Sequence, residues 1–149
     1  MAGEAKLVAT TQATLIASGA QLANGSYSTD AISLAQSAAA SFPQANFVLK
    51  AAFSAALGAG VVVELYRRDI NIVSTDEGPV PSASYPFKYV GNFPITSGVS
   101  TTVDEYPADG PIELNKVGDQ EFTVKDATGQ TMLAGWSLYA TPWSLVPGA

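Results

Sequence analysis

The stretch that decides the fold is EFTVKDATGQTMLAGWSLYATPW, residues 121–143. Apolar and polar residues alternate in its two halves, a turn signal joins the halves, and this pattern predicts strand, turn and strand. We therefore expect a β-hairpin in which Gly129 relaxes the turn and Gly135 lets the ring of Trp136 pack closely on the opposite sheet. The side chains expected in the core are Phe122, Val124, Met132, Trp136 and Leu138.

The same alternation recurs along most of the chain, interrupted by Gly, Pro, Asn and Asp. It is clearest at residues 46–56, where one face would carry Phe47, Leu49, Ala51 and Phe53. Further strands are expected within residues 14–28, 31–41, 61–72, 89–95, 101–103, 112–114, 121–125 and 131–141. This pattern predicts very little helix. The expected fold is all-β, a single jelly-roll-like β-sandwich of about eight strands with extended terminal arms.

One segment, AISLAQSAAAS at residues 31–41, is compatible with two structures. Its alanines suit a helix that Asp30 could cap, whereas Ile32 and Leu34 alternate as in a strand. We expect a strand followed by a loop up to Pro43.

The run GVVVELYRRDINIV, residues 60–73, changes the parity of its apolar positions, which are odd-numbered up to Leu65 and even-numbered from Ile70. A strand with a period of two residues changes faces only where an extra residue is inserted. We therefore expect a β-bulge or a strand break at residues 67–69, with exposed side chains. Arg67 and Arg68 would then act either as an interface anchor or in a local surface ion pair.

Residues 74–88 contain three prolines, which remove too many hydrogen-bond donors for a central strand and predict a long ordered loop. Four aromatic residues stand in and after its last part: Tyr85, Phe87, Tyr89 and Phe93. They could form a platform that stacks on sugars. Aromatic residues at alternate positions more often belong to a core, so both interpretations stay open.

Composition limits the classes of function. The 149 residues are 47% hydrophobic, enough for one domain spanning residues 1–149 with a real core. The 7 basic and 13 acidic residues give a net charge of −6, and scattered basic residues do not form the stripe that binds nucleic acid. No apolar run approaches the roughly 18 residues of a membrane span. The first residues lack the basic start and apolar block of a secretory signal.

The chain has no His and no Cys, which excludes a Ser-His-Asp triad, a thiol nucleophile and imidazole or thiolate metal ligands. The carboxylates that could converge are Asp76 with Glu77, and Asp104 with Glu105 and Asp109. They stand among Gly, Pro, Ser and Thr, which is typical of solvated loop charges rather than of a glycosidase pair or a calcium site. We therefore expect no enzymatic activity, no cofactor and no metal.

Apolar residues also occur near both ends of the chain. Residues 1–16 are expected to form an N-terminal arm, and residues 143–149 a C-terminal tail that contains Trp143, Leu145 and Val146. An apolar terminus either packs back on its own domain or docks on a neighbour.

Three stretches together resemble a known family: FPQANFVLKAAFSAALGAGVVVELYRRDINI at residues 42–72, PVPSASYPFKYVGNFPI at residues 79–95 and QEFTVKDATGQTMLAGWSLYATP at residues 120–142. They are similar to the small β-sandwich capsid decoration, or cement, proteins of tailed bacteriophages. The resemblance rests on pattern and carries over no active residues.

The resemblance implies a structural protein of the virion that binds the outer surface of the head and stabilises contacts between major capsid protein subunits. It also implies a homo-oligomer, dimer or trimer, with no contact to nucleic acid or membrane. The interface candidates are Arg67, Arg68, Tyr85, Phe87, Trp143, Leu145 and Val146. The alternative is a phage tail or host-surface carbohydrate-binding β-sandwich module, with residues 82–89 as the contact.

Overall fold

The computed structural model describes residues 3–28, 32–34, 42–69, 88–95, 101–114 and 120–148. These residues form ten β-strands and no helix, which confirms the all-β class. The strands are β1 (Gly3–Ala9), β2 (Ala13–Gly19), β3 (Ile32–Leu34), β4 (Gln44–Ala51), β5 (Val62–Asp69), β6 (Lys88–Pro94), β7 (Asp104–Pro107), β8 (Ile112–Glu113), β9 (Gln120–Ala127) and β10 (Trp136–Gly148).

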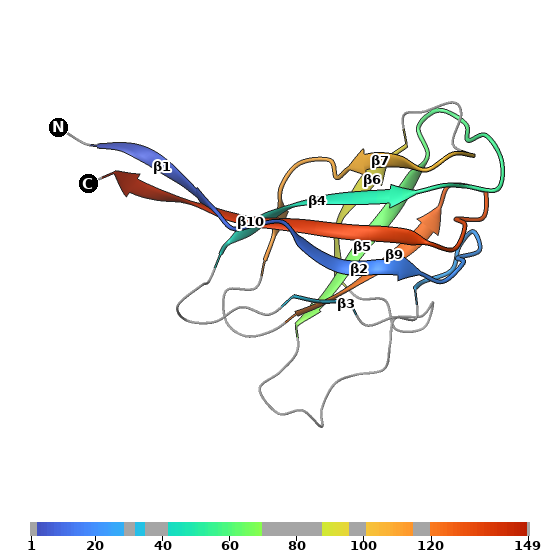
Figure 1. Ribbon diagram of the computed structural model, residues 1–149, viewed down its shortest axis with the longest axis horizontal. Coiled ribbons are helices and arrows are strands. Elements are labelled where there is room, and N and C mark those ends of the chain that lie inside the picture. The colour runs from blue at the N-terminus through green and yellow to red at the C-terminus, as the bar shows by residue number, and fades with distance from the viewer. Residues whose placement is uncertain are drawn as a thin grey trace, which may run out of the picture.

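The strands form two antiparallel sheets packed as a β-sandwich (Figure 1). Within the described residues, the larger sheet follows the path β1-β10-β4-β7, with β2 also paired to β10 and β8 to β4. The smaller sheet has the order β3-β9-β5-β6. Phe47 of the larger sheet packs on Phe122 of the smaller one, with ring centroids 4.9 Å apart in the shared core. The two-sheet sandwich is thus confirmed, whereas its jelly-roll order stays a prediction.

Strand β4 shows how directly the alternating pattern becomes packing. Phe47, Leu49 and Ala51 are buried, as expected, and so is Ala45, while the residues between them face outward. Full burial of a side chain as large as Phe or Leu stabilises a fold by about 1.5–3 kcal/mol. The strand begins at Gln44 and ends at Ala51, both earlier than expected. Phe53 lies beyond its end and forms an isolated β-bridge with Met132.

The expected hairpin at residues 121–143 is wrong in its pairing. β9 belongs to the smaller sheet and β10 to the larger one, so residues 128–135 cross between sheets instead of joining neighbouring strands. The core side chains expected on both strands are all buried. A carboxylate organises the crossing: Asp126 accepts hydrogen bonds from the backbone N–H of Thr128 (2.9 Å), the Thr128 hydroxyl (2.6 Å) and the N–H of Met132 (3.0 Å).

The room for the Trp136 ring comes from Gly19, not from Gly135 as expected. Gly19 of β2 is the register partner of Trp136, and a Cβ at residue 19 would overlap the indole ring. At Gly135 an added Cβ would meet nothing, but its φ of +91° is one that L side chains rarely adopt. Gly135 therefore allows the left-handed backbone of the turn, and Gly19 leaves room for the Trp136 ring.

The expected irregularity at residues 67–69 is also wrong. β5 pairs with β9 in unbroken register from Val62 to Asp69. The register shift lies on the other side of β5, against β6, where Leu65 pairs with Gly91 and Tyr66 pairs with Tyr89. Because the alternation continues, Arg67 points inward and is buried rather than exposed. Residues 70–73 lie outside the described residues.

Other strand boundaries differ by a few residues. β3 confirms a strand rather than a helix at Ile32–Leu34, and residues 35–41 lie outside the described part. The strand expected at residues 101–103 is wrong: β7 begins only at Asp104, opposite Ala51, where β4 ends. β10 begins at Trp136, later than expected, and continues to Gly148. The long loop expected at residues 74–88 lies outside the described residues except for Lys88.

Candidate functional site

Arg67 connects the two sheets. It lies in β5 of the smaller sheet, and its Nη1 donates a hydrogen bond to the backbone carbonyl of Glu113 in β8 of the larger sheet. The side chain is buried. In this position its guanidinium group is engaged within the sandwich.

Arg68 forms the local ion pair that was the alternative to an interface role. Its Nε and Nη2 lie 2.7 and 2.5 Å from Oε2 of Glu121, its register partner on β9. Both side chains are mostly buried. The aromatic candidates Tyr85 and Phe87 lie outside the described residues.

The two ends of the described chain form a ribbon that leaves the sandwich. β4 pairs with β10 only as far as Trp143, and beyond it residues 144–148 pair with β1 in the described structure. Figure 1 shows β1 and the end of β10 projecting together away from the two sheets. We call β1 and residues 143–148 the terminal ribbon. The expected N-terminal arm, residues 1–16, therefore contains β1 but also the first part of β2, which pairs inside the larger sheet.

Two leucines are paired and exposed on the terminal ribbon. Leu7 and Leu145 are register partners, so their side chains lie on the same face, and they are 60% and 63% exposed. Trp143 lies on this face too, two residues before Leu145, and its Nε1 donates a hydrogen bond to Asn46 Oδ1 at 3.1 Å. The backbone of Val146 pairs with that of Lys6, and the Val146 side chain lies outside the described part of the structure.

Three tyrosines gather on the outer face of the smaller sheet. The Tyr66 ring packs edge to face against the rings of Tyr27 and Tyr89, with centroids 5.4 and 5.7 Å away. Because Val63 and Leu65 of β5 are buried, the alternation turns Tyr66 away from the core. Tyr89 is 49% exposed.

Polar groups hold these rings in place. The Tyr66 hydroxyl donates a hydrogen bond to Glu64 (2.7 Å), and the side-chain amide of Asn92 donates one to the Tyr89 hydroxyl (2.7 Å). Lys125 Nζ lies 3.6 Å from the Glu64 carboxylate and 5.3 Å from the centroid of the Tyr27 ring. We call this set the tyrosine face: Tyr27, Glu64, Tyr66, Tyr89, Asn92 and Lys125.

The environment of Tyr66 favours its neutral phenol. Partial burial raises the pKa of Tyr66 above its usual value, and the hydrogen bond to Glu64 and the negative charge of that carboxylate raise it further. The Tyr66 hydroxyl therefore remains a donor well above neutral pH.

The aromatic residues that lie together on this face are not the four that the sequence suggested as a sugar-stacking platform. Phe93 is buried in the core, as its alternate position allowed, whereas Tyr89 is exposed. Sequence reasoning missed Tyr27 and Tyr66. An outward position on β5 signals Tyr66, but Tyr27 reaches this face through a bridge to Lys125 and through backbone hydrogen bonds of its neighbours Ser26 and Ser28 to β9, which no local pattern reveals.

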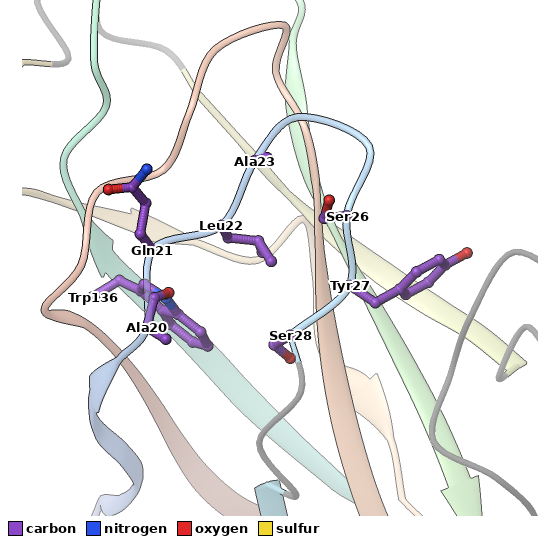
Figure 2. Close-up of a pocket in the computed structure, with 8 residues that line it drawn as sticks. All are labelled: Ala20, Gln21, Leu22, Ala23, Ser26, Tyr27, Ser28 and Trp136. Carbon is purple, nitrogen blue, oxygen red and sulfur yellow. The ribbon is translucent and has the colours of Figure 1, made fainter.

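A pocket of about 380 Å³ opens beside the loop that follows β2 (Figure 2). Its lining residues are Ala20, Gln21, Leu22, Ala23, Ser26, Tyr27, Ser28 and Trp136. Trp136 Nε1 donates to the carbonyl of Ala20 (2.8 Å), and the Ser28 hydroxyl accepts from the N–H of Val124 (3.1 Å). In Figure 2 the Tyr27 ring points away from Trp136 and out of the pocket. Because the Trp136 and Ser28 side chains hold the loop against the sandwich, the pocket has the character of a packing feature.

The acidic candidates are surface groups. Asp104, Glu105 and Asp109 are exposed, and Asp104 Oδ1 accepts a hydrogen bond from the Glu105 N–H (2.8 Å). Among the described residues, no three acidic side chains are grouped closely enough to hold a metal ion. Asp76 and Glu77 lie outside the described residues.

Comparisons with protein-family models, with curated proteins and with solved structures found no match to the chain. In the part of the chain that the structure describes, no helix has the length and apolar character needed to cross a membrane.

Proposed function

We propose that this protein is a capsid decoration, or cement, protein of a tailed bacteriophage, bound to the outer surface of the head and bridging major capsid protein subunits. The observation that carries the proposal is the terminal ribbon, with Leu7 and Leu145 paired and exposed on it. A two-stranded ribbon is only marginally stable in water. Docking on another protein would bury the leucines and stabilise the ribbon.

The sandwich suits the rest of this role. Packaged DNA pushes capsid subunits apart, and a rigid body that grips several subunits adds contact area without touching the genome. The net charge of −6 accords with a protein that does not contact nucleic acid. Association as a dimer or trimer would place several ribbons on one particle and raise its effective affinity for the head. The role requires no catalytic group.

The decisive test is binding to expanded heads assembled without the protein. Purified wild-type protein should co-sediment with such heads in many copies. Replacing both ribbon leucines, Leu7→Ser with Leu145→Ser, should weaken binding at least about tenfold, equivalent to roughly 1.4 kcal/mol. Val103→Ser is the matched control, because Val103 is 60% exposed but lies outside the ribbon.

Two results would contradict the proposal. If wild-type protein does not bind the heads, the decoration role itself is excluded. Wild-type protein that binds, together with a double leucine variant that binds as tightly as Val103→Ser, removes the ribbon as the contact.

A phage tail or host-surface carbohydrate-binding module is the second candidate, and the tyrosine face is the observation that favours it. Copy number separates the two roles. A decoration protein is present in hundreds of copies per head, whereas a tail module is present in a few, so quantitative protein gels of purified particles distinguish them.

A further inference from the structure

We propose that the tyrosine face binds an oligosaccharide, with the exposed ring of Tyr89 as the stacking surface and Glu64, Asn92 and Lys125 as the hydrogen-bonding rim. This site is independent of the proposed attachment to the head. It would give a particle that carries the protein a second binding activity, toward glycans.

Strand pairing assembles the site from distant parts of the sequence. One row across the sheet contains Lys125 of β9, Glu64 of β5 and Asn92 of β6, which are successive register partners. The next row contains Tyr66 of β5 and its partner Tyr89 of β6. Register partners present their side chains on the same face, so a row of polar groups lies alongside a row of aromatic rings.

The rings are fixed before any ligand arrives. Tyr66 is held by edge-to-face packing on both sides and by its hydrogen bond to Glu64. Tyr89 is held by Tyr66 and by the amide of Asn92, although half of its surface is exposed. A surface that is already ordered loses little conformational entropy on binding.

The chemistry of the face matches a sugar ring. A pyranose presents weakly polarised C–H groups on its faces, which are attracted to the negative face of an aromatic ring, and hydroxyl groups around its edge. The carboxylate of Glu64 accepts from hydroxyl groups, the ammonium of Lys125 donates to them, and the amide of Asn92 can do both. Aromatic and polar groups lie side by side here, as the two aspects of a sugar ring require.

A protein partner fits this face less well. The centre of a protein–protein interface is depleted of charged residues, because burying them is costly. Here a Glu and a Lys lie beside the tyrosines, and the alternation along β5 and β9 places the Arg68–Glu121 pair on the same outer face of the smaller sheet. A hydroxyl-rich ligand can satisfy these groups without removing all of them from water.

The position of the face allows both activities at once. The terminal ribbon continues the larger sheet, whereas the tyrosine face is the outer surface of the smaller sheet. A molecule attached through the ribbon can therefore keep the tyrosine face accessible.

The test uses purified full-length protein on a printed array of neutral oligosaccharides, including cellohexaose, maltohexaose and chitohexaose, and of purified bacterial surface polysaccharides. At least one glycan should bind, and titration calorimetry then gives its affinity. Tyr89→Ala and Asn92→Ala should each weaken binding at least about tenfold. Tyr89→Phe keeps the ring and should stay within about threefold of wild type.

Tyr139→Ala is the matched control, because Tyr139 is a partly exposed tyrosine on the outer face of the other sheet, and it should bind as wild type. Thermal unfolding of each variant confirms that the fold is intact. An array without binding overturns the inference, as does binding that Tyr89→Ala leaves unchanged. Capture of a protein partner through Tyr89, with a blank array, would identify the face as a protein interface instead. Head binding is measured separately through the ribbon leucines, so the two proposals fail independently.

Discussion

Gly19 lies so close to the indole of Trp136 that the ring occupies the place where a side chain at residue 19 would begin. The two residues are register partners on β2 and β10. The ring is held there by its hydrogen bond to the carbonyl of Ala20. The absence of a side chain at residue 19 is therefore part of the core packing of the larger sheet.

Gly19→Ala should lower the free energy of unfolding by about 1–3 kcal/mol, the usual cost of overpacking, because the ring or the strand must shift. Gly58→Ala is the matched control. A Cβ at Gly58 would meet nothing, and its backbone is not left-handed, so this variant should be neutral or up to about 1 kcal/mol more stable. Urea unfolding measures both. Equal stability of the two variants would show that the ring has room to move.

Asp126→Ala should destabilise the fold by about 1–3 kcal/mol, because it leaves the N–H of Thr128 buried without its acceptor and removes one of the two acceptors of the Met132 N–H, which also donates to the carbonyl of Leu22. Asp126→Asn keeps an acceptor oxygen and should cost less. The control is Asp109→Ala, at an exposed position, which should stay within about 0.5 kcal/mol of wild type. The urea concentrations at the unfolding midpoints rank the stabilities of the three variants. An Asp126→Ala variant as stable as the Asp109→Ala variant would contradict the role given to the Asp126 carboxylate.

Tyr66 should ionise above the pH range of an ordinary tyrosine, for which the pKa is about 10. Ultraviolet titration should therefore show a late component, which Tyr66→Phe reduces and Glu64→Gln moves to lower pH by removing the acceptor carboxylate. Tyr106, whose pKa is also raised by burial and by Asp104, accounts for the late signal that remains. A titration unchanged by Tyr66→Phe would contradict this assignment.

The raised pKa of Tyr66 also makes the stability of the fold depend on pH. The fold favours the neutral phenol of Tyr66, so its raised pKa contributes stability that is fully present below pH 10 and is lost as the pH rises toward the folded-state pKa. Wild-type protein should therefore lose more stability in this alkaline range than Tyr66→Phe does. Urea unfolding at a series of alkaline pH values measures the difference, and parallel curves would exclude it.

Amide hydrogen exchange should separate the terminal ribbon from the sandwich. In the isolated protein, the amides of β1 should exchange much faster than those of β4 and β9, because among the described strands β1 pairs with β10 alone, whereas β4 and β9 lie inside their sheets. Binding to heads should slow exchange in β1 specifically. Equal protection of β1 and β4 in the isolated protein would contradict the view of the ribbon as an unsupported element.

The sequence predicted what depends on near neighbours. The alternation around Phe47 and Leu49 determines which side of a strand is buried, whichever strands lie beside it, and the buried face of β4 was predicted correctly although its ends were not. The pairing of β9 and β10 was not predictable in this way. A hairpin and a crossing between sheets bury the same side chains, and β10 is held in the larger sheet by β4, β2 and β1, which lie far away in the sequence.

In the candidate sites, too, only the features that depend on local sequence could be predicted. An exposed apolar terminus at Leu145 could be expected from the sequence, but its partner Leu7 could not, because only strand register brings them together. The tyrosine face likewise joins residues that no local pattern connects. The prediction at Arg67 was wrong because β5 continues its alternation to the end, so the apolar parity that reappears at Ile70 says nothing about residues 67–69.

Strand β10 runs without interruption from the middle of the larger sheet into the ribbon, pairing with β4 along residues 137–143 and with β1 beyond them. The hydrogen bonds of an antiparallel pair are perpendicular to its strands. A pull along the ribbon would therefore load these bonds in shear, many at the same time, instead of opening them one after another from an end. If the ribbon is the tether, mechanical tension reaches the sandwich along its most resistant direction.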